Sequence, residues 1–308
     1  MTNSDTQYRQ GITPFIWFDS EAEDAARLYT SLFANSRITH LSRYSSEGHD
    51  AHGQPAGKVM VAAFELAGQQ FSGLNGGPMF KPNPSISFFV ELDTEEEVNA
   101  LWAGLGEGGS VLMPLDNYPW SQHYCWLNDR YGVSWQIMLR ANQDGGQTIT
   151  PVLMFTQENL GRATEAIELY TSTFPRSAAG AVQFREAAAA EEPATVLFGR
   201  FTLFGQDFII MDAPGSHDFS FTEGMSLMVS CETQSEIDRY WDRLTADGGQ
   251  ESHCGWLKDK FGVSWQITPT IMGQLMASTD QATADRLMRE MLTMRKMDIA
   301  ALEAAARG

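Results

Sequence analysis

The sequence Trp126-Leu-Asn-Asp-Arg-Tyr-Gly-Val-Ser-Trp-Gln-Ile137 returns almost unchanged as Trp256-Leu-Lys-Asp-Lys-Phe-Gly-Val-Ser-Trp-Gln-Ile267. The chain is therefore an internal duplication. Each copy is typical of a β-hairpin, because an aromatic and aliphatic arm is followed by a polar turn with glycine and by a second β-rich arm. Side chains alternate along a strand, so Ser134 and Gln136 share one face and Trp135 lies on the other. We expect helices behind the apolar face and a cavity in front of the polar one.

The two copies predict two domains, at residues 11–141 and 148–271, followed by a tail at residues 277–308. The 308 residues are enough for each half to bury its own core. Hydrophobic residues make up 43% of the chain and charged ones 19%, which is typical of a globular protein. Methionine and leucine recur at helical spacing in the tail. This pattern predicts a helix that docks on the chain's own core or joins two copies into a homo-oligomer.

Charge and targeting signals exclude several classes of partner. The formal charge of -18 argues against a nucleic-acid partner, because binding phosphates requires a basic surface. The segment Met1 to Gln10 lacks the layout of a signal peptide, and no apolar run is long enough to span a membrane. We therefore expect a cytoplasmic protein without a membrane partner. Cys125, Cys231 and Cys254 are odd in number and lack Cys-x-x-Cys spacing, which indicates reduced structural thiols.

Within each half, a strand, a helix and three strands follow one another, and then the pattern repeats. The first half begins with a strand at Ile12–Phe18. After Phe18 the spacing of apolar residues changes from two to about three and a half residues, which predicts a helix. Four β-α-β-β-β units predict an α+β fold. The halves differ in one place, because Ser110 to Tyr124 is longer than its counterpart, Gln250 to Cys254. The first half is therefore predicted to carry an extra loop.

The four units, the opening sequence Ile12-Thr-Pro-Phe-Ile-Trp-Phe-Asp19, the turn Leu74-Asn-Gly-Gly-Pro78 and the repeated hairpin resemble the PhnB-like branch of the vicinal oxygen chelate superfamily. This branch is often labelled demethylubiquinone methyltransferase-like, and the superfamily contains glyoxalase I, bleomycin-resistance proteins and extradiol dioxygenases. The resemblance covers residues 11 to 300. It implies an α+β fold of two glyoxalase-like cups, each from two βαβββ units, plus a C-terminal helical extension. Single-domain relatives pair as dimers, so it also implies that the fusion builds that pairing into one chain.

Metal-dependent members of the superfamily hold their ion with His or Glu at four positions inside the cup. Carried over to this chain, these positions fall within Ile12–Pro14, around Ser72–Leu74, and at Ser87 and Gln136, while the third and fourth positions of the second half are Ser226 and Gln266. None of these residues is His, Asp or Glu, and hydroxyl and amide groups are poor ligands for a transition metal. The chain also lacks a glycine-rich turn between a strand and a helix, which a nucleotide-type cofactor would need. We therefore predict no metal and no cofactor.

Several side chains are candidates for a site, and each also has a structural explanation. His123 and His253 precede the two hairpin tryptophans by three residues, and we expect them close to the glutamines across the strand pair. His123 could act as a general base or donate a hydrogen bond to a ligand, or it could be a half-exposed strand residue. Trp120 could close the cup over an aromatic ligand or simply hold its own loop. Asn75 could orient a ligand or serve the Asn-Gly-Gly turn.

The leading hypothesis is metal-independent binding of a small apolar or aromatic metabolite or drug-like compound in the cup. The residues assigned to this role are Ser87, Gln136, His123, Trp120 and Asn75, with Ser226, Gln266 and His253 in the second cup. One alternative is an isomerase or lyase of the superfamily type, in which His123 is the base. Another is a non-catalytic scaffold whose second cup has lost its site. Whether the chain is an enzyme stays open at this point.

Overall fold

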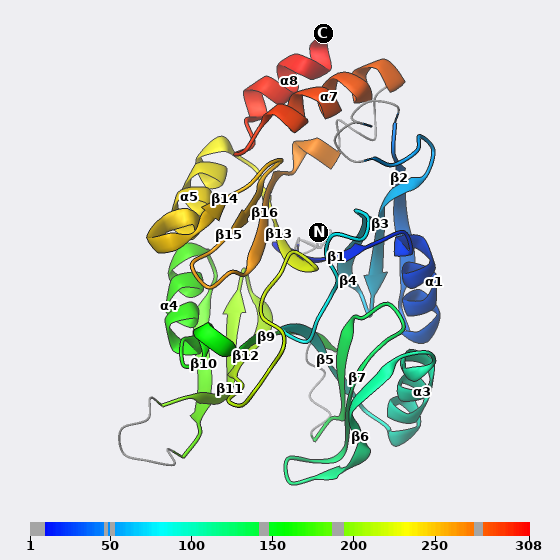
Figure 1. The fold of residues 1–308 in the computed structure, drawn as a ribbon, viewed down its shortest axis with the longest axis vertical. Coiled ribbons are helices and arrows are strands. Elements are labelled where there is room, and N and C mark those ends of the chain that lie inside the picture. The colour runs from blue at the N-terminus through cyan, green and yellow to red at the C-terminus, as the bar shows by residue number, and fades with distance from the viewer. Residues whose placement is uncertain (1–9, 46–48, 50–52, 142–147, 187–193, 274–279) are drawn as a thin grey trace, which may run out of the picture.

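The computed structural model describes residues 10–45, 49, 53–141, 148–186, 194–273 and 280–308 (Figure 1). It contains the four predicted units and two further helices at the C-terminal end. The first half consists of β1 (Ile12–Phe18), α1 (Ala22–Leu32), β2 (Arg37–Arg43), β3 (Val59–Leu66), β4 (Gln69–Asn75), β5 (Ile86–Leu92), α3 (Glu95–Gly106), β6 (Ser110–Tyr118), β7 (Ser121–Asn128) and β8 (Ser134–Leu139). The second half consists of β9 (Ile149–Phe155), η1 (Gln157–Asn159), α4 (Ala163–Thr173), β10 (Ala178–Phe184), β11 (Val196–Leu203), β12 (Gln206–Asp212), β13 (Met225–Cys231), α5 (Gln234–Thr245), η2 (Ala246–Gly248), β14 (Gln250–Glu251), β15 (Trp256–Lys258) and β16 (Ser264–Pro269).

The strands form two eight-stranded sheets, and each sheet takes one unit from each half. One sheet has the order β14-β15-β16-β13-β1-β4-β3-β2, and its inner face is called cup A below. The other has the order β10-β11-β12-β9-β5-β8-β7-β6, and its inner face is called cup B. The halves are joined by two antiparallel pairs, β1 with β13 and β5 with β9. Each cup is thus built from two units, as predicted, but the two units of a cup come from different halves of the chain.

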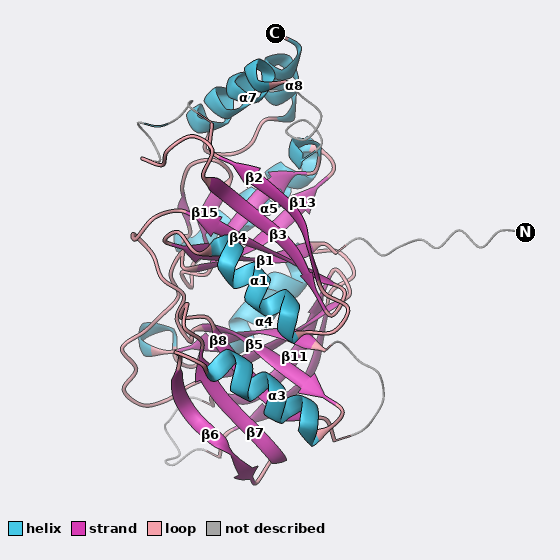
Figure 2. Ribbon diagram, turned by 90° about the vertical axis from the view of Figure 1, so that its right-hand side faces the viewer, coloured by secondary structure: helices cyan, strands magenta, loops and turns pink. Residues whose placement is uncertain are grey.

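Helices cover the outer faces of both sheets (Figure 2), and their packing explains why the two units of one half do not share a sheet. The ring of Tyr29 in α1 lies 5.3 Å from that of Trp135 in β8, so the first two units meet through a helix and the back of a sheet. Phe33 of the same helix also contacts Trp135. The apolar side of the hairpin is therefore buried against helices, as the alternation predicted. The strand edges of β1 and β5 are left to pair with the other half.

A buried aspartate in the repeated hairpin organises this packing. Asp129 accepts hydrogen bonds from the Tyr29 hydroxyl at 2.7 Å and the Trp135 indole at 2.9 Å. It also accepts two bonds from the backbone of its own turn, at Tyr131 and Val133. The second half repeats the arrangement around Asp259. Each aspartate thus ties the hairpin turn to a helix of the neighbouring unit.

The longer segment of the first half is not the predicted loop. Residues 110–118 form strand β6 and pair with β7, so the extension is a long β-hairpin with Pro119 and Trp120 at its tip. Register shifts interrupt this pairing at three places, and such bulges bend a strand and increase its twist. The counterpart in the second half is reduced to the short strands β14 and β15.

The C-terminal helices α7 (Gln281–Thr293) and α8 (Ile299–Arg307) dock on the second half of the same chain. The backbone carbonyl of Met294 accepts a bond from Cys254, and the Gln234 side chain bonds Met297 and Ile299. Leu287 and Leu302 are buried, so the methionine and leucine stripe packs within the chain. The predicted start of the tail, at residues 277–279, lies outside the described residues, and a homo-oligomer through this helix stays a prediction. None of the helices described is long and apolar enough to cross a bilayer.

Candidate ligand-binding cups

Three polar side chains meet on the inner face of cup B. The Gln136 amide on β8 donates to the Ser87 hydroxyl on β5 at 3.0 Å, and its oxygen accepts from the Tyr124 hydroxyl on β7 at 2.8 Å. Strand pairing explains the arrangement, because Ser87 lies opposite Ser134 and Gln136 lies one pleat further along the same face. Gln136 is only 4% exposed. The polar tip predicted from the alternation is therefore a buried hydrogen-bonded chain.

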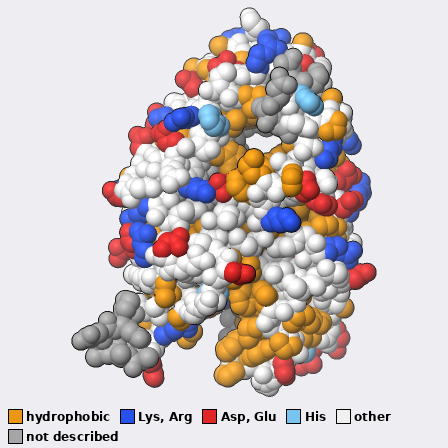
Figure 3. Space-filling view, viewed as in Figure 1, with side chains coloured by type: hydrophobic (Ala, Val, Ile, Leu, Met, Phe, Trp, Pro, Cys, Tyr) orange, Lys and Arg blue, Asp and Glu red, His pale blue; other side chains and the backbone are white. Residues whose placement is uncertain are grey.

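Apolar and aromatic side chains surround this chain. They come from both halves and consist of Phe89, Tyr124, Val152 and Ile209, with Met113, Tyr118, Trp126, Met138, Phe198 and Met211 packed against them. Trp120 stacks on Tyr118 at 5.2 Å and contacts Tyr124 edge-on at 5.8 Å, although 60% of its surface is exposed. Figure 3 shows hydrophobic side chains gathered at the lower right of the molecule, where Figure 1 places β6 and β7. Trp120 thus contacts the side chains that line cup B, and its role in covering a ligand stays a prediction.

Cup A repeats the polar pair but differs in what covers it. Gln266 donates to Ser226 at 3.0 Å, as Gln136 does to Ser87. The position of Tyr124 is taken by Cys254, and the Trp256 ring contacts the rings of Phe15 and Trp17, each 6.1 Å away. Cup A is therefore lined by the rings of Phe15, Trp17 and Trp256, and among the described residues it has no equivalent of the long hairpin.

The four positions per cup at which the sequence resemblance implies metal ligands in metal-dependent proteins are combined differently here, because each cup takes units from both halves. Cup B combines Ser87 and Gln136 with Thr150 of β9 and Ile209 of β12, because β9 and β12 are the counterparts of β1 and β4. Cup A combines the corresponding side chains of the other units, which are Thr13, Ser72, Ser226 and Gln266. These hydroxyl, amide and alkyl groups fit a divalent transition metal poorly. Among the described residues, no cluster of three His, Cys, Asp or Glu could hold a metal ion.

One buried hydroxyl in each cup has no hydrogen-bond partner among the described residues. They are Thr150 Oγ1 in cup B and Ser264 Oγ in cup A. The Ser134 hydroxyl, which corresponds to Ser264, accepts a bond from the Trp126 indole at 2.8 Å. An unpaired buried hydroxyl costs about 1–3 kcal/mol. Thr150 is therefore a group that a bound molecule could pair with, and its side chain completes the polar floor of cup B.

The structure does not bring the two histidines to the glutamines. His123 bonds Asn99 of α3 at 2.9 Å, so its ring lies on the helix side of β7, opposite to Tyr124 and Gln136. The expected closeness to Gln136 is wrong because His123 differs from Tyr124 by one residue, which reverses the face. His253 is exposed in the turn before β15. Neither ring therefore belongs to a cup.

Asn75 has a structural role in the described residues. Its oxygen accepts from the first amide of α1, at Ala22, and its nitrogen donates to the carbonyl of Val59, so both ends of the amide are engaged. Asp212 in the second half does the same for Gly161 and Val196. These side chains connect the end of a strand to the start of a helix. The hydrogen bonds of Asn75 are made to the backbone and not to side chains of a cup, so its role in ligand binding stays a prediction.

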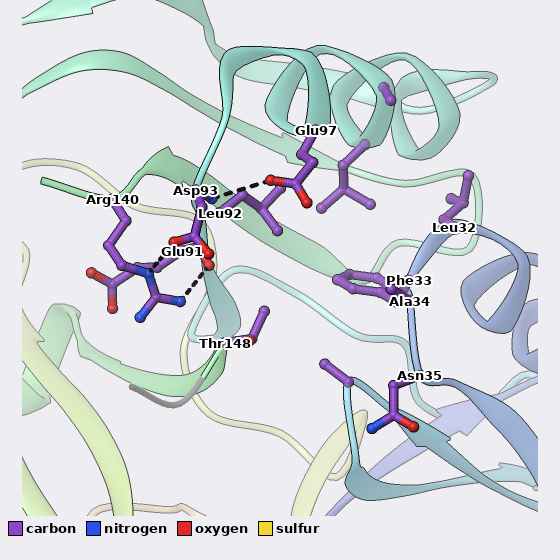
Figure 4. Close-up of a pocket in the computed structure, with 13 residues that line it drawn as sticks. Leu32, Phe33, Ala34, Asn35, Glu91, Leu92, Asp93, Glu97, Arg140 and Thr148 are labelled. Carbon is purple, nitrogen blue, oxygen red and sulfur yellow. Dashed lines mark hydrogen bonds and ion pairs between the residues drawn. The ribbon is translucent and has the colours of Figure 1, made fainter. Parts of the chain in front are cut away.

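A pocket of about 420 Å³ lies away from both cups, between α1 and α3 (Figure 4). Its charged side chains are engaged in local structure. Arg140 pairs with Asp93 at 3.0 Å and donates to the carbonyl of Glu91, and Glu97 belongs to the capping box that starts α3. We therefore rank this pocket below cup B as a ligand site.

Three buried polar groups escaped the sequence analysis. Tyr124 could not be found by comparing the halves, because its counterpart is Cys254 and only repeated residues draw attention. Burial raises the pKa of its hydroxyl, so it acts as a hydrogen-bond donor at neutral pH. Asp129 and Asp259 do repeat, and the fixed spacing from each aspartate to the buried tryptophan was the signal that could have identified the network.

Comparisons with known proteins agree with this architecture. A PhnB protein from Bacillus cereus, described as a 3-demethylubiquinone-9 3-methyltransferase, is 41% identical over 42% of this chain and 100% of its own, with a TM-score of 0.39. A glyoxalase I variant from Zea mays is 9% identical but covers 84% of this chain and 94% of its own with a TM-score of 0.53, so the likeness concerns the fold alone. No curated protein sequence matches the chain.

The family profile described as 3-demethylubiquinone-9 3-methyltransferase matches residues 10–138 and again residues 147–268. The two matches cover most of the chain and coincide with the two halves of the duplication. The chain therefore belongs to this family, as a tandem duplication of a PhnB-like unit, and its likeness to glyoxalase I is one of fold.

Proposed function

We propose that the protein binds a small, largely apolar or aromatic molecule in cup B without a metal ion. The observation that carries the proposal is the chain from Tyr124 through Gln136 to Ser87, set in a lining of aromatic and methionine side chains. Ligand sites are mostly apolar with a few placed polar groups, and cup B has this composition. The unpaired hydroxyl of Thr150 adds a further acceptor and donor.

The long hairpin is the part of cup B that would admit a ligand. Gln136 and Tyr124 are almost fully buried, so a ligand must displace side chains before it reaches them. Tyr118 and Trp120 near the hairpin tip stack on each other above Tyr124, and the bulged pairing of β6 with β7 leaves this tip the easiest part to move. In the proposed complex the two rings stack on the ligand, while Gln136 and Ser87 bind its polar group.

The other hypotheses receive less support. A general-base role for His123 lacks geometry, because its ring faces Asn99 rather than the cup. The methyl transfer named in the family description would need a site for a methyl donor. The four turns between strand and helix, at residues 19–21, 93–94, 156–162 and 232–233, contain only one glycine, Gly161, so none of them is a glycine-rich phosphate loop. A scaffold role fits cup A better than cup B, because the short strands β14 and β15 stand there in place of the long hairpin and the Phe15 and Trp17 rings contact Trp256.

Matched variants in the two cups test the proposal. Neutral aromatic compounds with one hydrogen-bonding group, such as 2-naphthol and quinoline, would be screened by thermal shift. A ligand at about a hundred times its dissociation constant stabilises the folded chain by roughly 2.7 kcal/mol. We expect Gln136→Leu to abolish this stabilisation and Gln266→Leu in cup A to retain it. If no compound of this class stabilises the protein, or if both variants respond alike, cup B is not the site.

A further inference from the structure

A second pocket, of about 480 Å³, lies where the end of β1 meets the turn of the β7–β8 hairpin. Its walls include the rings of Trp17, Phe80 and Tyr131, the carboxylates of Asp19 and Glu21, and the backbone around Arg130. The Trp17 and Phe80 rings contact each other edge-on at 5.1 Å. The pocket lies outside cup B, so it is independent of the site proposed above.

The second half of the duplication shows what occupies the corresponding place there. Arg162, at the start of α4, holds its guanidinium 4.4 Å from the centre of the Phe261 ring and donates to the carbonyl of Lys260 at 3.3 Å. It also pairs with Glu165 through two nitrogen atoms, at 2.9 and 3.2 Å. The Asn159 amide donates to the carbonyl of Phe261 at 2.7 Å. A guanidinium and an amide thus fill this place from within the chain.

The first half has the corresponding aromatic ring, backbone carbonyls and carboxylate, but it lacks the guanidinium and the amide that bind them in the second half. Tyr131 corresponds to Phe261 and Asp24 to Glu165, while Glu21 takes the place of Arg162, and the insertion that carries Asn159 is missing. No described residue donates a hydrogen bond to the backbone carbonyls of Arg130 and Tyr131. The place held by an arginine in one half is therefore a pocket with acceptors and carboxylates in the other.

The charges around the pocket favour a cation. Burial raises the pKa of the Tyr131 hydroxyl, the charge of Arg130 lowers it, and the carboxylates of Asp24, Asp129 and Glu21 raise it, so carboxylates and one guanidinium act on this ring. The two basic residues of the rim oppose a cation only in part, because Arg130, which lowers the pKa of Tyr131, is paired with Glu107 at 3.1 Å and Lys81 is exposed to solvent. The net charge of -18 adds a long-range attraction for cations.

In the second half, a lysine and a guanidinium lie side by side because both pair with one carboxylate. Lys260, the counterpart of Arg130, pairs with Glu165 at 2.6 Å while Arg162 binds the same carboxylate. An aromatic face, carbonyl oxygens and carboxylates together match the planar donor fork of a guanidinium or amidinium group.

We propose that the pocket beside Trp17 and Tyr131 binds a small organic cation whose guanidinium or amidinium group takes the position that Arg162 holds in the second half. The cation stacks on the Tyr131 ring, donates to the carbonyls of Arg130 and Tyr131, and pairs with Glu21 or Asp24. Trp17 and Phe80 cover its apolar part.

Calorimetric titration with benzamidine tests the site, with benzamide as the uncharged control of equal shape. We expect saturable binding of benzamidine, and binding of benzamide that is weaker by about tenfold or more, since hydrogen bonds from a charged donor are about twice as strong. Glu21→Arg places an arginine directly before α1, as Arg162 stands directly before α4. Its guanidinium should fill the pocket and abolish binding of benzamidine. Glu21→Gln should weaken binding by about tenfold.

Glu158→Gln is the matched control, because it removes the same charge from an exposed position in the second half and should leave binding unchanged. The inference is overturned if benzamidine shows no saturable binding, if benzamide binds as well, or if Glu21→Arg binds as tightly as the parent chain. A crystal soaked in benzamidine should show the amidinium over the Tyr131 ring. Density elsewhere only would contradict the assignment. None of these outcomes depends on a ligand in cup B.

Discussion

Replacement of Asp259 by asparagine tests the network that ties the repeated hairpin to a helix. One carboxylate oxygen accepts from the backbone of Phe261 and Val263, and the other accepts from the Tyr170 hydroxyl and the Trp265 indole. An asparagine can keep the two backbone bonds with its oxygen. Its amide nitrogen then faces the indole, and two donors cannot bond each other. The Trp265 bond is lost, at a cost of about 1–3 kcal/mol.

The size of this effect should depend on pH. Burial raises the pKa of Asp259 from 3.8 to about 6, despite the four hydrogen bonds that lower it. A carboxyl whose pKa is higher in the folded chain than in the unfolded chain stabilises the fold while protonated. This contribution is fully present below the unfolded pKa and is lost as the pH rises through the folded one. Between about pH 4 and pH 7 the parent chain therefore loses roughly 2 kcal/mol through this group, and the asparagine variant does not.

Urea unfolding of both proteins across this pH range measures the difference. We expect the variant to be less stable at about pH 4 and the gap to narrow by roughly 2 kcal/mol toward pH 7. Other carboxylates cancel in the comparison because they are shared. Asp247→Asn, at an exposed position, controls for the loss of one negative charge. A gap that stays constant or widens with pH would refute the account of Asp259.

Three further results are expected. Tyr124→Phe should lower the free energy of unfolding by about 1–2 kcal/mol, because the Gln136 oxygen loses its donor inside cup B, and chemical denaturation checks this; an unchanged stability would mean that water replaces the hydroxyl. Residues 10–141 expressed alone should form a dimer by light scattering, since the β1 and β5 edges lose their partners; a folded monomer would contradict the pairing of the halves. The thiols of Cys125 and Cys231 should resist a maleimide at pH 8 until the chain unfolds, because burial raises the pKa of each to about 12, and rapid labelling of either would contradict this.

Local structure was predictable because it depends on near neighbours. The alternation of Gln136 and Trp135 correctly predicted which side chain enters the cup and which meets a helix. The bounds of the first strand, Ile12–Phe18, were also predicted at both ends. In these segments the periodicity of apolar residues and the flanking glycine turns act together.

Pairing between distant strands was not predictable in the same way. β1 needs an apolar strand along its free edge, and both β5 and β13 satisfy that requirement, because the duplication makes them nearly equivalent. The choice depends on where the helices pack, through contacts such as Tyr29 with Asp129. The prediction for His123 was wrong for another reason. Adjacent residues of a strand point to opposite faces, so Tyr124 and not His123 faces Gln136.

The pairing of units from different halves affects how the sequence of such a chain can evolve. A single-repeat chain that pairs with itself must carry every substitution twice, so its two cups stay identical. In the fused chain a change to one copy alters one cup and leaves the other alone. The long hairpin over cup B, the Trp17 ring that contacts Trp256 in cup A and the guanidinium of Arg162 are each present in one copy only. Duplication thus allows the two cups to differ in sequence, although each sheet still takes one unit from each half.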